Sequence, residues 1–416
     1  MNRAALLFVA SLLASCVTPP PVTASPAATE SPPPSPAPGA TATPALTANP
    51  TVLPTPAVSP ASPAKPIAGV GARAVLSPNG KLLAVPEAPP GGKVPYVPAA
   101  LVYDLDGKLV RRVEAPGGTW RWLPDSSGLF VALDAPQRSS QLGTVDLATG
   151  TARDTGLQMA GASLSRDGTW ILADHQEGCC MDIEQREIWI APRTGGTAKV
   201  FVRSNTERQQ PMGIVGVDAQ DRLVYRDDSQ VFRMAVAGGT PQLLGTLASA
   251  AVLGNEPGFT EGDASPDGTV MLMRTYDPLR WYVVANDRVT MWSDAIGSII
   301  EDKDGIRLQY YASAVWAGAH AVLVRSSSGE LASLDLVTGG RASYRASLAA
   351  DDVALAYDTG RLLVARGRRA LLIDLASGET TDAGIDIGTE SVGALGAGLP
   401  TGGFILSTAT ATYRID

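Results

Sequence analysis

The stretch Ala264–Gly268 reads Ala-Ser-Pro-Asp-Gly, a tight polar turn, and the strand-forming run Thr269–Met273 follows it directly. Such a turn requires a residue at positive φ, which glycine supplies without steric cost. The same pairing of a polar turn and an apolar run recurs along the chain and predicts many short antiparallel strands. Related turns lie at Leu76–Gly80, Leu123–Gly128 and Leu164–Gly168, with degenerate copies at Ala219–Arg222, Ala317–Ala319, Asp358–Gly360 and Pro400–Gly403.

A second type of turn alternates with the first. It reads Asp-Leu, a small or β-branched residue, a hydroxyl residue and Gly, as in Asp146–Gly150, Asp335–Gly339 and Asp374–Gly378. Looser forms occur at Asp104–Gly107, Arg193–Gly195 and Val236–Gly238. From Gly80 to Gly402 the first type of turn recurs at a mean spacing of about 46 residues, which suits a four-stranded propeller blade of ~40–50 residues.

These turns predict an all-β chain that forms a seven- or eight-bladed β-propeller. The turn count favours eight blades, although two of the turns match the pattern poorly. The last repeat ends early, with Gly403–Ser407 and Thr412–Asp416 as its second and third strands. We expect Ile67–Val70 to supply the missing strand, because closing the ring in this way removes an exposed sheet edge.

The Ser-Pro-Asp-Gly turns and their following strands resemble the repeats of TolB-like, WD-repeat-like bacterial propellers over about residues 70–416. Ser265–Gly268 matches that repeat fully. The resemblance implies an interaction or scaffolding surface in the cell envelope. TolB-like proteins place a small α/β domain before the propeller, whereas this chain has a Pro-rich segment there. The partners of that family therefore do not carry over.

The N-terminus has the pattern of a secretory signal peptide over residues 1–15. Arg3 precedes the apolar run Ala4–Leu13, which is too short to span ~30 Å of hydrocarbon as a helix. The segment Leu13–Cys16, Leu-Ala-Ser-Cys, resembles the lipobox of bacterial lipoproteins. The resemblance implies that Cys16 is diacylated and anchors the chain to a lipid bilayer, in an extracytoplasmic location. Ordinary cleavage with an incidental Cys16 is the alternative.

Residues 16–66 have the composition of a disordered linker, and we expect the propeller over residues 67–416. Half of the chain's 32 prolines lie before residue 67, among Ala, Ser, Thr and Val. Such a segment has too little bulky apolar surface to offset its ordering entropy, and proline favours an extended tether.

Composition also excludes several functional classes. The formal net charge is −8, and an acidic surface repels phosphate backbones, which argues against nucleic-acid binding. With 2 His and 3 Cys in the chain, a zinc site of the usual ligands is not expected. No Gly-x-Ser-x-Gly elbow and no phosphate-binding glycine loop occur, and we expect no cofactor.

The most unusual local segment is 174–184, which interrupts the third repeat between strands ending at Ala173 and beginning at Glu187. In an exported protein the adjacent Cys179 and Cys180 can close a vicinal disulfide. One interpretation is a stapled rim loop with solvated acids. Another is a ligand-contact loop that uses Asp174, His175, Glu177 and Asp182. A metal or redox role is a third interpretation.

Two groups of aromatic residues stand out. Trp120 and Trp122 are two residues apart, so they share one face of a strand; a second group lies between Trp281 and Trp316. We expect these rings to pack between blades rather than to bind a ligand from the surface.

Taken together, these features predict a non-enzymatic module that binds a protein or a glycan and has no catalytic residues. A propeller enzyme of the lyase, glycosidase or quinoprotein type is the alternative.

Overall fold

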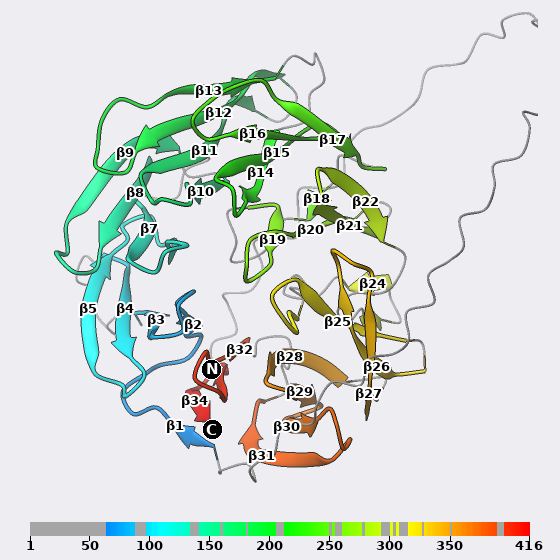
Figure 1. Cartoon of the computed structure of the whole chain (residues 1–416). Helices are drawn as coiled ribbons and strands as arrows, with labels where there is room; N and C mark the ends of the chain where they lie inside the picture. Colours follow the sequence, from blue (N-terminus) through cyan, green and yellow to red (C-terminus); the bar gives the residue numbers. More distant parts are fainter. Residues whose placement is uncertain are drawn as a thin grey trace, which may run out of the picture. The chain divides into compact units, whose positions relative to one another are not determined.

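The computed structural model describes residues 64–87, 97–133, 141–158, 161–179, 182–204, 212–248, 252–253, 260–276, 279–292, 300–302, 305–307, 315–326, 328–349, 352–388 and 395–416. Within these ranges the regular elements are all β-strands. Eight antiparallel sheets follow one another around a ring (Figure 1), so the chain is an eight-bladed β-propeller, as the turn count predicts. No membrane-spanning helix occurs in the described part of the chain.

Blades 1 to 4 are regular four-stranded sheets whose first strand lies nearest the ring's centre. Their strands are β2 (Val75–Leu76), β3 (Leu82–Pro86), β4 (Ala99–Asp104) and β5 (Leu109–Glu114); β6 (Trp120–Trp122), β7 (Gly128–Ala132), β8 (Gln141–Asp146) and β9 (Ala152–Gln158); β10 (Ala162–Leu164), β11 (Trp170–Cys179), β12 (Asp182–Pro192) and β13 (Lys199–Arg203); and β14 (Met212–Val217), β15 (Arg222–Asp227), β16 (Gln230–Ala235) and β17 (Gln242–Thr246).

Blades 5 to 8 vary more. Blade 5 has two short inner strands that both pair with β20, and blade 6 has three strands plus an isolated bridge between Trp316 and Val322. Their strands are β18 (Val252–Leu253), β19 (Gly262–Ala264), β20 (Met271–Tyr276), β21 (Leu279–Ala285) and β22 (Arg288–Trp292); β25 (Ala321–Arg325), β26 (Glu330–Asp335) and β27 (Arg341–Ser347); β28 (Asp352–Asp358), β29 (Arg361–Arg366), β30 (Arg369–Asp374) and β31 (Thr380–Asp386); and β32 (Leu395–Gly398), β33 (Phe404–Ser407), β34 (Thr412–Ile415) and β1 (Lys65–Pro66). A separate hairpin pairs β23 (Ile300–Asp302) with β24 (Gly305–Arg307).

Each turn of the first type joins the first and second strands of a blade. In blade 5, the Ser265 hydroxyl donates to Asp267 Oδ1 at 2.6 Å and accepts from the Val270 amide at 3.0 Å. Gly268 closes this turn at φ 72°. The Ser and Asp side chains thus satisfy the backbone and each other, which explains why this sequence recurs at the same place in other blades.

The core consists of apolar contacts between neighbouring blades. Successive side chains of a strand point to opposite faces of the sheet. In β11, Ile171 and Ala173 therefore pack against blade 2, whereas Leu172 packs against blade 4. Among the described residues, eight such clusters fill the eight blade-to-blade interfaces.

The aromatic residues take part in these interfaces, as predicted for the two tryptophans on β6. Trp122 is 5% exposed and packs between blades 1 and 2, and its Nε1 donates to the Val75 carbonyl at 3.0 Å. Trp281 is buried between blades 5 and 6. Trp122 and Trp281 thus contribute to the packing between blades.

Polar contacts also join the first turn of one blade to the next blade. The Asn79 amide donates to Ser126 Oγ at 2.9 Å, the Arg166 amide to Asp221 Oδ1 at 2.7 Å, the Ala219 amide to the Gly268 carbonyl at 2.9 Å, and the Gly403 amide to Asp358 Oδ2 at 2.6 Å. Between blades 5 and 6 the connecting residue is His320. Its Nδ1 lies 3.2 Å from Asp267 Oδ2 and its Nε2 lies 3.0 Å from Asp335 Oδ2.

The ring closes through a strand from the other end of the chain. The closing strand β1 is Lys65–Pro66, paired with Tyr413 and Arg414 of β34, and so lies two residues before the expected Ile67–Val70. Ile67 and Val70 instead pack into the interface between blades 8 and 1. The edge of β34 is thereby covered.

Removal of the closing segment should destabilise the ring. A chain that begins at residue 71 loses the β1 pairing and the burial of Ile67 and Val70, which are 8% and 7% exposed. We expect its free energy of unfolding to fall by about 3–6 kcal/mol, since each of the two buried aliphatic side chains contributes about 1.5–3 kcal/mol. Urea titration checks this against a chain that begins at residue 64. Equal unfolding midpoints would contradict the role given to this segment.

The contact between His320 and two carboxylates predicts a pH-dependent stability. Hydrogen bonding to Asp267 raises the pKa of His320 above its usual value of 6.5, and the charge of Asp335 adds to this. The stabilisation is therefore fully present below pH 6.5 and is lost as the pH rises through the raised pKa. Because the site is partly exposed, we expect His320→Gln to cost about 0.5–1 kcal/mol at pH 6 and nothing at pH 10. Melting temperatures of both proteins across this range check it; a pH-independent difference would refute it.

Candidate functional site

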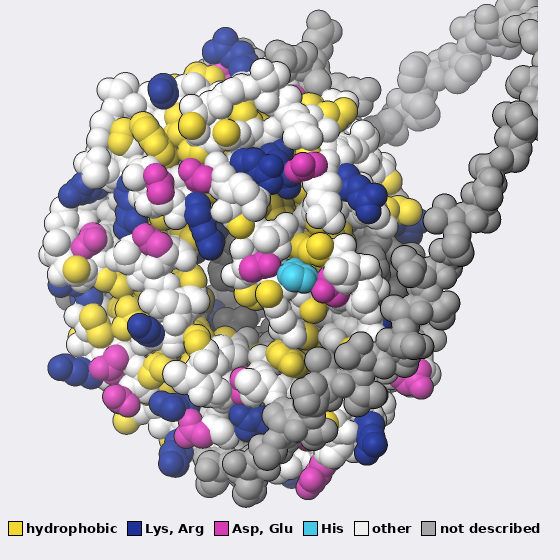
Figure 2. Space-filling model, viewed as in Figure 1, with side chains coloured by type: hydrophobic (Ala, Val, Ile, Leu, Met, Phe, Trp, Pro, Cys, Tyr) yellow, Lys and Arg dark blue, Asp and Glu magenta, His cyan; other side chains and the backbone are white. Residues whose placement is uncertain are grey.

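The first strands of blades 1 to 5 surround a central cavity of about 770 Å³. Figure 2 shows that the face of the ring is hollowed near its centre. The walls are residues of β2, β6, β10, β14 and β19 together with the turns that follow them. Gly262 brings two of these strands together, because a Cβ at this position would lie 2.5 Å from the Val215 carbonyl oxygen.

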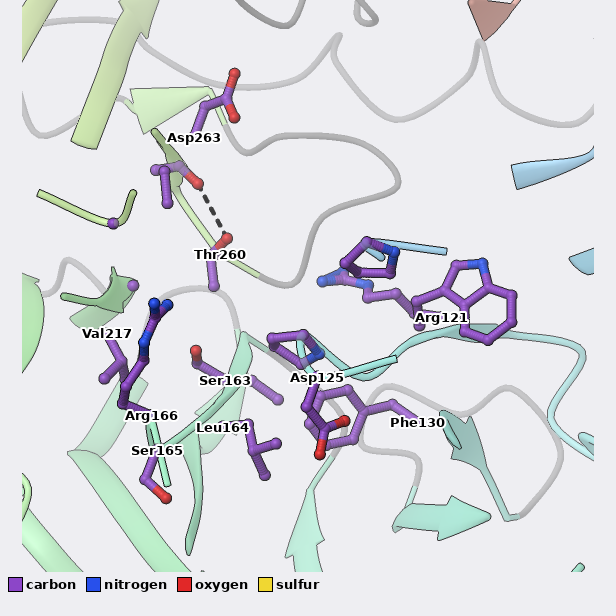
Figure 3. Close-up of a pocket in the computed structure, with 18 of the residues that line it drawn as sticks. Arg121, Asp125, Phe130, Ser163, Leu164, Ser165, Arg166, Val217, Thr260 and Asp263 are labelled. Carbon is purple, nitrogen blue, oxygen red and sulfur yellow. Dashed lines mark hydrogen bonds between the residues drawn. The ribbon is translucent and has the colours of Figure 1, made fainter. Parts of the chain in front are cut away.

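Arg121 reaches into the cavity from β6. In the sequence it lies between Trp120 and Trp122, whose side chains face blade 1. Because successive side chains of a strand point to opposite faces of the sheet, the Arg121 side chain points away from blade 1. Figure 3 shows its guanidinium directed into the open space. Burial lowers the pKa of Arg121 to about 8, which reflects the cost of holding a cation away from water.

Arg166 comes from the next blade, in the turn after β10. Its guanidinium points into the same space, toward Thr260 (Figure 3). Its backbone amide is held by Asp221. Within the described ranges, the Arg166 guanidinium makes no hydrogen bond or ion pair.

The two carboxylates among the lining residues turn away from the cavity. Asp125 forms an ion pair with Arg193 at 2.5 Å, and Asp263 Oδ1 accepts from Trp316 Nε1 at 3.3 Å. Figure 3 shows both carboxylates directed away from the space into which the two arginines point. Among the described lining residues, the charges that face the interior of the cavity are therefore positive.

The remaining wall is mainly aliphatic and aromatic, with a few hydroxyl groups. Ser163 and Thr260 are its polar members nearest the arginines in Figure 3, and the Thr260 hydroxyl donates to the Gly262 carbonyl at 3.0 Å. Among the described lining residues there is no His, Cys or Lys. Such a wall can bind a ligand by charge and apolar contact, but it offers no acid–base pair for proton transfer.

The predicted loop at 174–184 is a hairpin in the structure. Strands β11 and β12 continue past Ala173 and Glu187 to Cys179 and Asp182, with His175 opposite Glu187 and Cys179 opposite Asp182. The boundaries expected from the sequence are therefore wrong, because the polar residues of 174–184 continue the backbone pairing of the two strands. Cross-strand hydrogen bonds need no apolar side chains.

Asp174 lies on β11, on the same face of the strand as Leu172, which packs against blade 4. Its amide donates to the Gly161 carbonyl at 2.8 Å, at the end of β10 opposite the turn. Its Oδ1 is sealed from solvent and has no hydrogen-bond partner among the described residues. Burial, with a further contribution from the charge of Glu261, raises the pKa of Asp174 well above its usual range.

Glu261 is engaged by Arg226, which donates to both of its carboxylate oxygens at 2.7 and 2.5 Å. Gly213 makes room for this carboxylate, since a Cβ there would lie 2.1 Å from it. Burial would lower the pKa of Arg226, but the hydrogen bonds and charge of Glu261 outweigh it and raise the pKa. The group is a buried structural ion pair beside Asp174.

The other predicted residues of this segment lie along the same hairpin. His175 packs on Trp189 with ring centroids 4.8 Å apart. The structure gives the strand positions of Glu177, Cys179 and Asp182 in this hairpin. Two further predicted residues, Cys16 and Cys180, lie outside the described residues. The described residues contain no group of three His, Cys, Asp or Glu that could hold a metal ion.

Sequence reasoning missed both arginines of the cavity. A signal for Arg121 was present, because a charged residue between two strand tryptophans must occupy the opposite face from them. Arg166 resembles any charged residue of a solvated turn. The two side chains face the same cavity only because successive blades are arranged in a ring, and the sequence of a single repeat does not reveal this arrangement.

No protein-family model matches the chain, and no curated protein is significantly similar to it. Solved structures with a similar fold include the C-terminal WD40 domain of Sif2, at 11% identity and a TM-score of 0.49, covering 86% of this chain and 99% of that one. TolB from Acinetobacter baumannii has 15% identity and a TM-score of 0.36, with 64% and 63% covered. The dihydro-heme d1 dehydrogenase NirN has 14% identity and a TM-score of 0.49, with 81% and 70% covered. Propellers of the WD40 and TolB kinds are thus among its structural neighbours, while the fold assignment itself rests on the strand topology.

Proposed function

We propose that this chain is a membrane-anchored extracytoplasmic lipoprotein whose propeller is a non-enzymatic binding module. The central cavity carries the binding part of this proposal. It is large enough for a small ligand or a segment of a partner, and the charged groups that face its interior are arginines rather than an acid–base pair.

The anchoring part rests on the N-terminal sequence. Leu13–Cys16 supplies the lipobox-like signal, and the Pro-rich segment up to residue 66 supplies a tether. A single acyl chain binds membranes only marginally, whereas two or more hold a protein firmly. Acylation of Cys16 would thus keep the propeller at the membrane surface, with its partner a protein or a glycan of the cell envelope.

Intact mass of the membrane-fraction protein tests the anchor. We expect a chain that begins at Cys16 and carries the added mass of a diacylglycerol group, and we expect Cys16→Ala to abolish both that mass and membrane retention. Reduction should add two daltons when Cys179 and Cys180 form a disulfide. An unlipidated mature chain in the membrane fraction would overturn the lipoprotein assignment.

Site-specific photo-cross-linking in cells tests the binding role. A photoreactive residue in place of Pro124, which is exposed and lines the cavity, should give a discrete adduct because the partner enters there. The matched control replaces Leu243, which is 51% exposed on the outermost strand of blade 4. Adducts at Leu243 but not at Pro124 would contradict a role for the cavity.

A further inference from the structure

We propose that the central cavity binds a carboxylate attached to an apolar peptide segment, such as the C-terminal end of a partner protein. Arg121 and Arg166 would hold the carboxylate, and the surrounding aliphatic and aromatic wall would hold the segment. This inference rests on the proposed binding function and specifies its ligand.

The direction of the charges is the first argument. The two guanidinium groups enter the cavity from the neighbouring blades 2 and 3, whereas Asp125 and Asp263 turn their carboxylates outward to Arg193 and Trp316. A guanidinium presents a planar fork of donors that matches a carboxylate in a bidentate arrangement. The cavity is therefore built for an anion.

The environment of Arg121 is the second argument. Its side chain is partly buried on the face of β6 turned away from Trp120, and it lines the cavity together with Phe130 and Leu164, where the low polarity strengthens attraction to an opposite charge. Burial also depresses the pKa of Arg121, which reflects the cost of keeping this cation away from water. A carboxylate bound in the cavity would place an opposite charge beside the guanidinium.

The rest of the wall distinguishes among anions. A chain with a formal net charge of −8 repels polyanions such as nucleic acids as they approach. Sugars need many inward hydrogen-bonding groups, but the described wall offers mainly the hydroxyls of Ser163 and Thr260, with apolar residues such as Leu76, Val215 and Val217. A single carboxylate on an apolar peptide suits this wall better than an acidic glycan.

Titration of the full-length Cys16→Ala chain with two matched probes tests the proposal by calorimetry. The probes are acetyl-Leu-Leu with a free C-terminal carboxylate and the same dipeptide with a C-terminal amide. Because a hydrogen bond to a charged group contributes about 1.5–3 kcal/mol, we expect the acid to bind at least tenfold more tightly than the amide. Equal affinities, or binding of neither probe, would overturn the assignment.

Two variants identify the residues responsible. Arg166 is exposed in a turn, so Arg166→Gln should fold normally and weaken binding of the acid about tenfold while leaving the amide unchanged. Arg121→Gln should do the same, and melting curves show whether it folds. Arg288→Gln, on the outermost strand of blade 5, is the control and should change nothing. Loss of acid binding in the Arg288 variant, or none in the Arg166 variant, would refute the proposal.

A third probe, trigalacturonate, separates peptide from glycan. Tighter binding of this acidic sugar than of the acid dipeptide would overturn the peptide assignment. Failure of both dipeptides while a Pro124 cross-link still forms would refute the carboxylate inference alone. Absence of the cross-link as well would refute the proposed function.

Discussion

Every blade of this propeller depends on its two neighbours, because both faces of each sheet are apolar. Leu172 and its neighbour Ile171 belong to different interfaces although they are adjacent in the chain. A blade left at the end of a row would expose one of these faces, so the structure is stable only as a closed ring. The use of residues near Lys65 to pair with the last strand follows directly from this constraint.

Closure also decides what the turns must do. The first turn of each blade faces the centre of the ring, where neighbouring blades are nearest to each other. Polar groups in these turns, such as Asn79 with Ser126 and Asp267 with His320, bond across the blade boundaries. Each turn must satisfy its own backbone hydrogen bonds and also form a hydrogen bond to the next blade. Short polar side chains can do both, which accounts for the Ser, Asp and Asn of the repeat.

The fold could be predicted from the sequence because these turns recur with the same short polar side chains. The turn at Ser265–Gly268 reports local backbone geometry, and its spacing of about 46 residues reports the size of a blade. Both are short-range properties that the printed sequence contains. The length of β11 and β12 was not predictable in the same way, because polar residues such as Asp174 and His175 extend the hairpin through backbone pairing that leaves no apolar alternation.

The cavity could not be predicted in this way, because residues from five blades form its wall. Arg121 and Arg166 are 45 residues apart in the chain, and only the turning of successive blades makes them face the same space. The carboxylates are removed from that space by equally non-local contacts, with Asp125 held by Arg193 of the next blade. The ion pair between Asp125 and Arg193 joins blades 2 and 3 and so stabilises the ring. It also directs the Asp125 carboxylate away from the cavity, where the two arginines remain. A substitution at Arg193 would therefore alter both stability and the proposed binding of a carboxylate, whereas a substitution at Arg166 would alter the proposed binding alone.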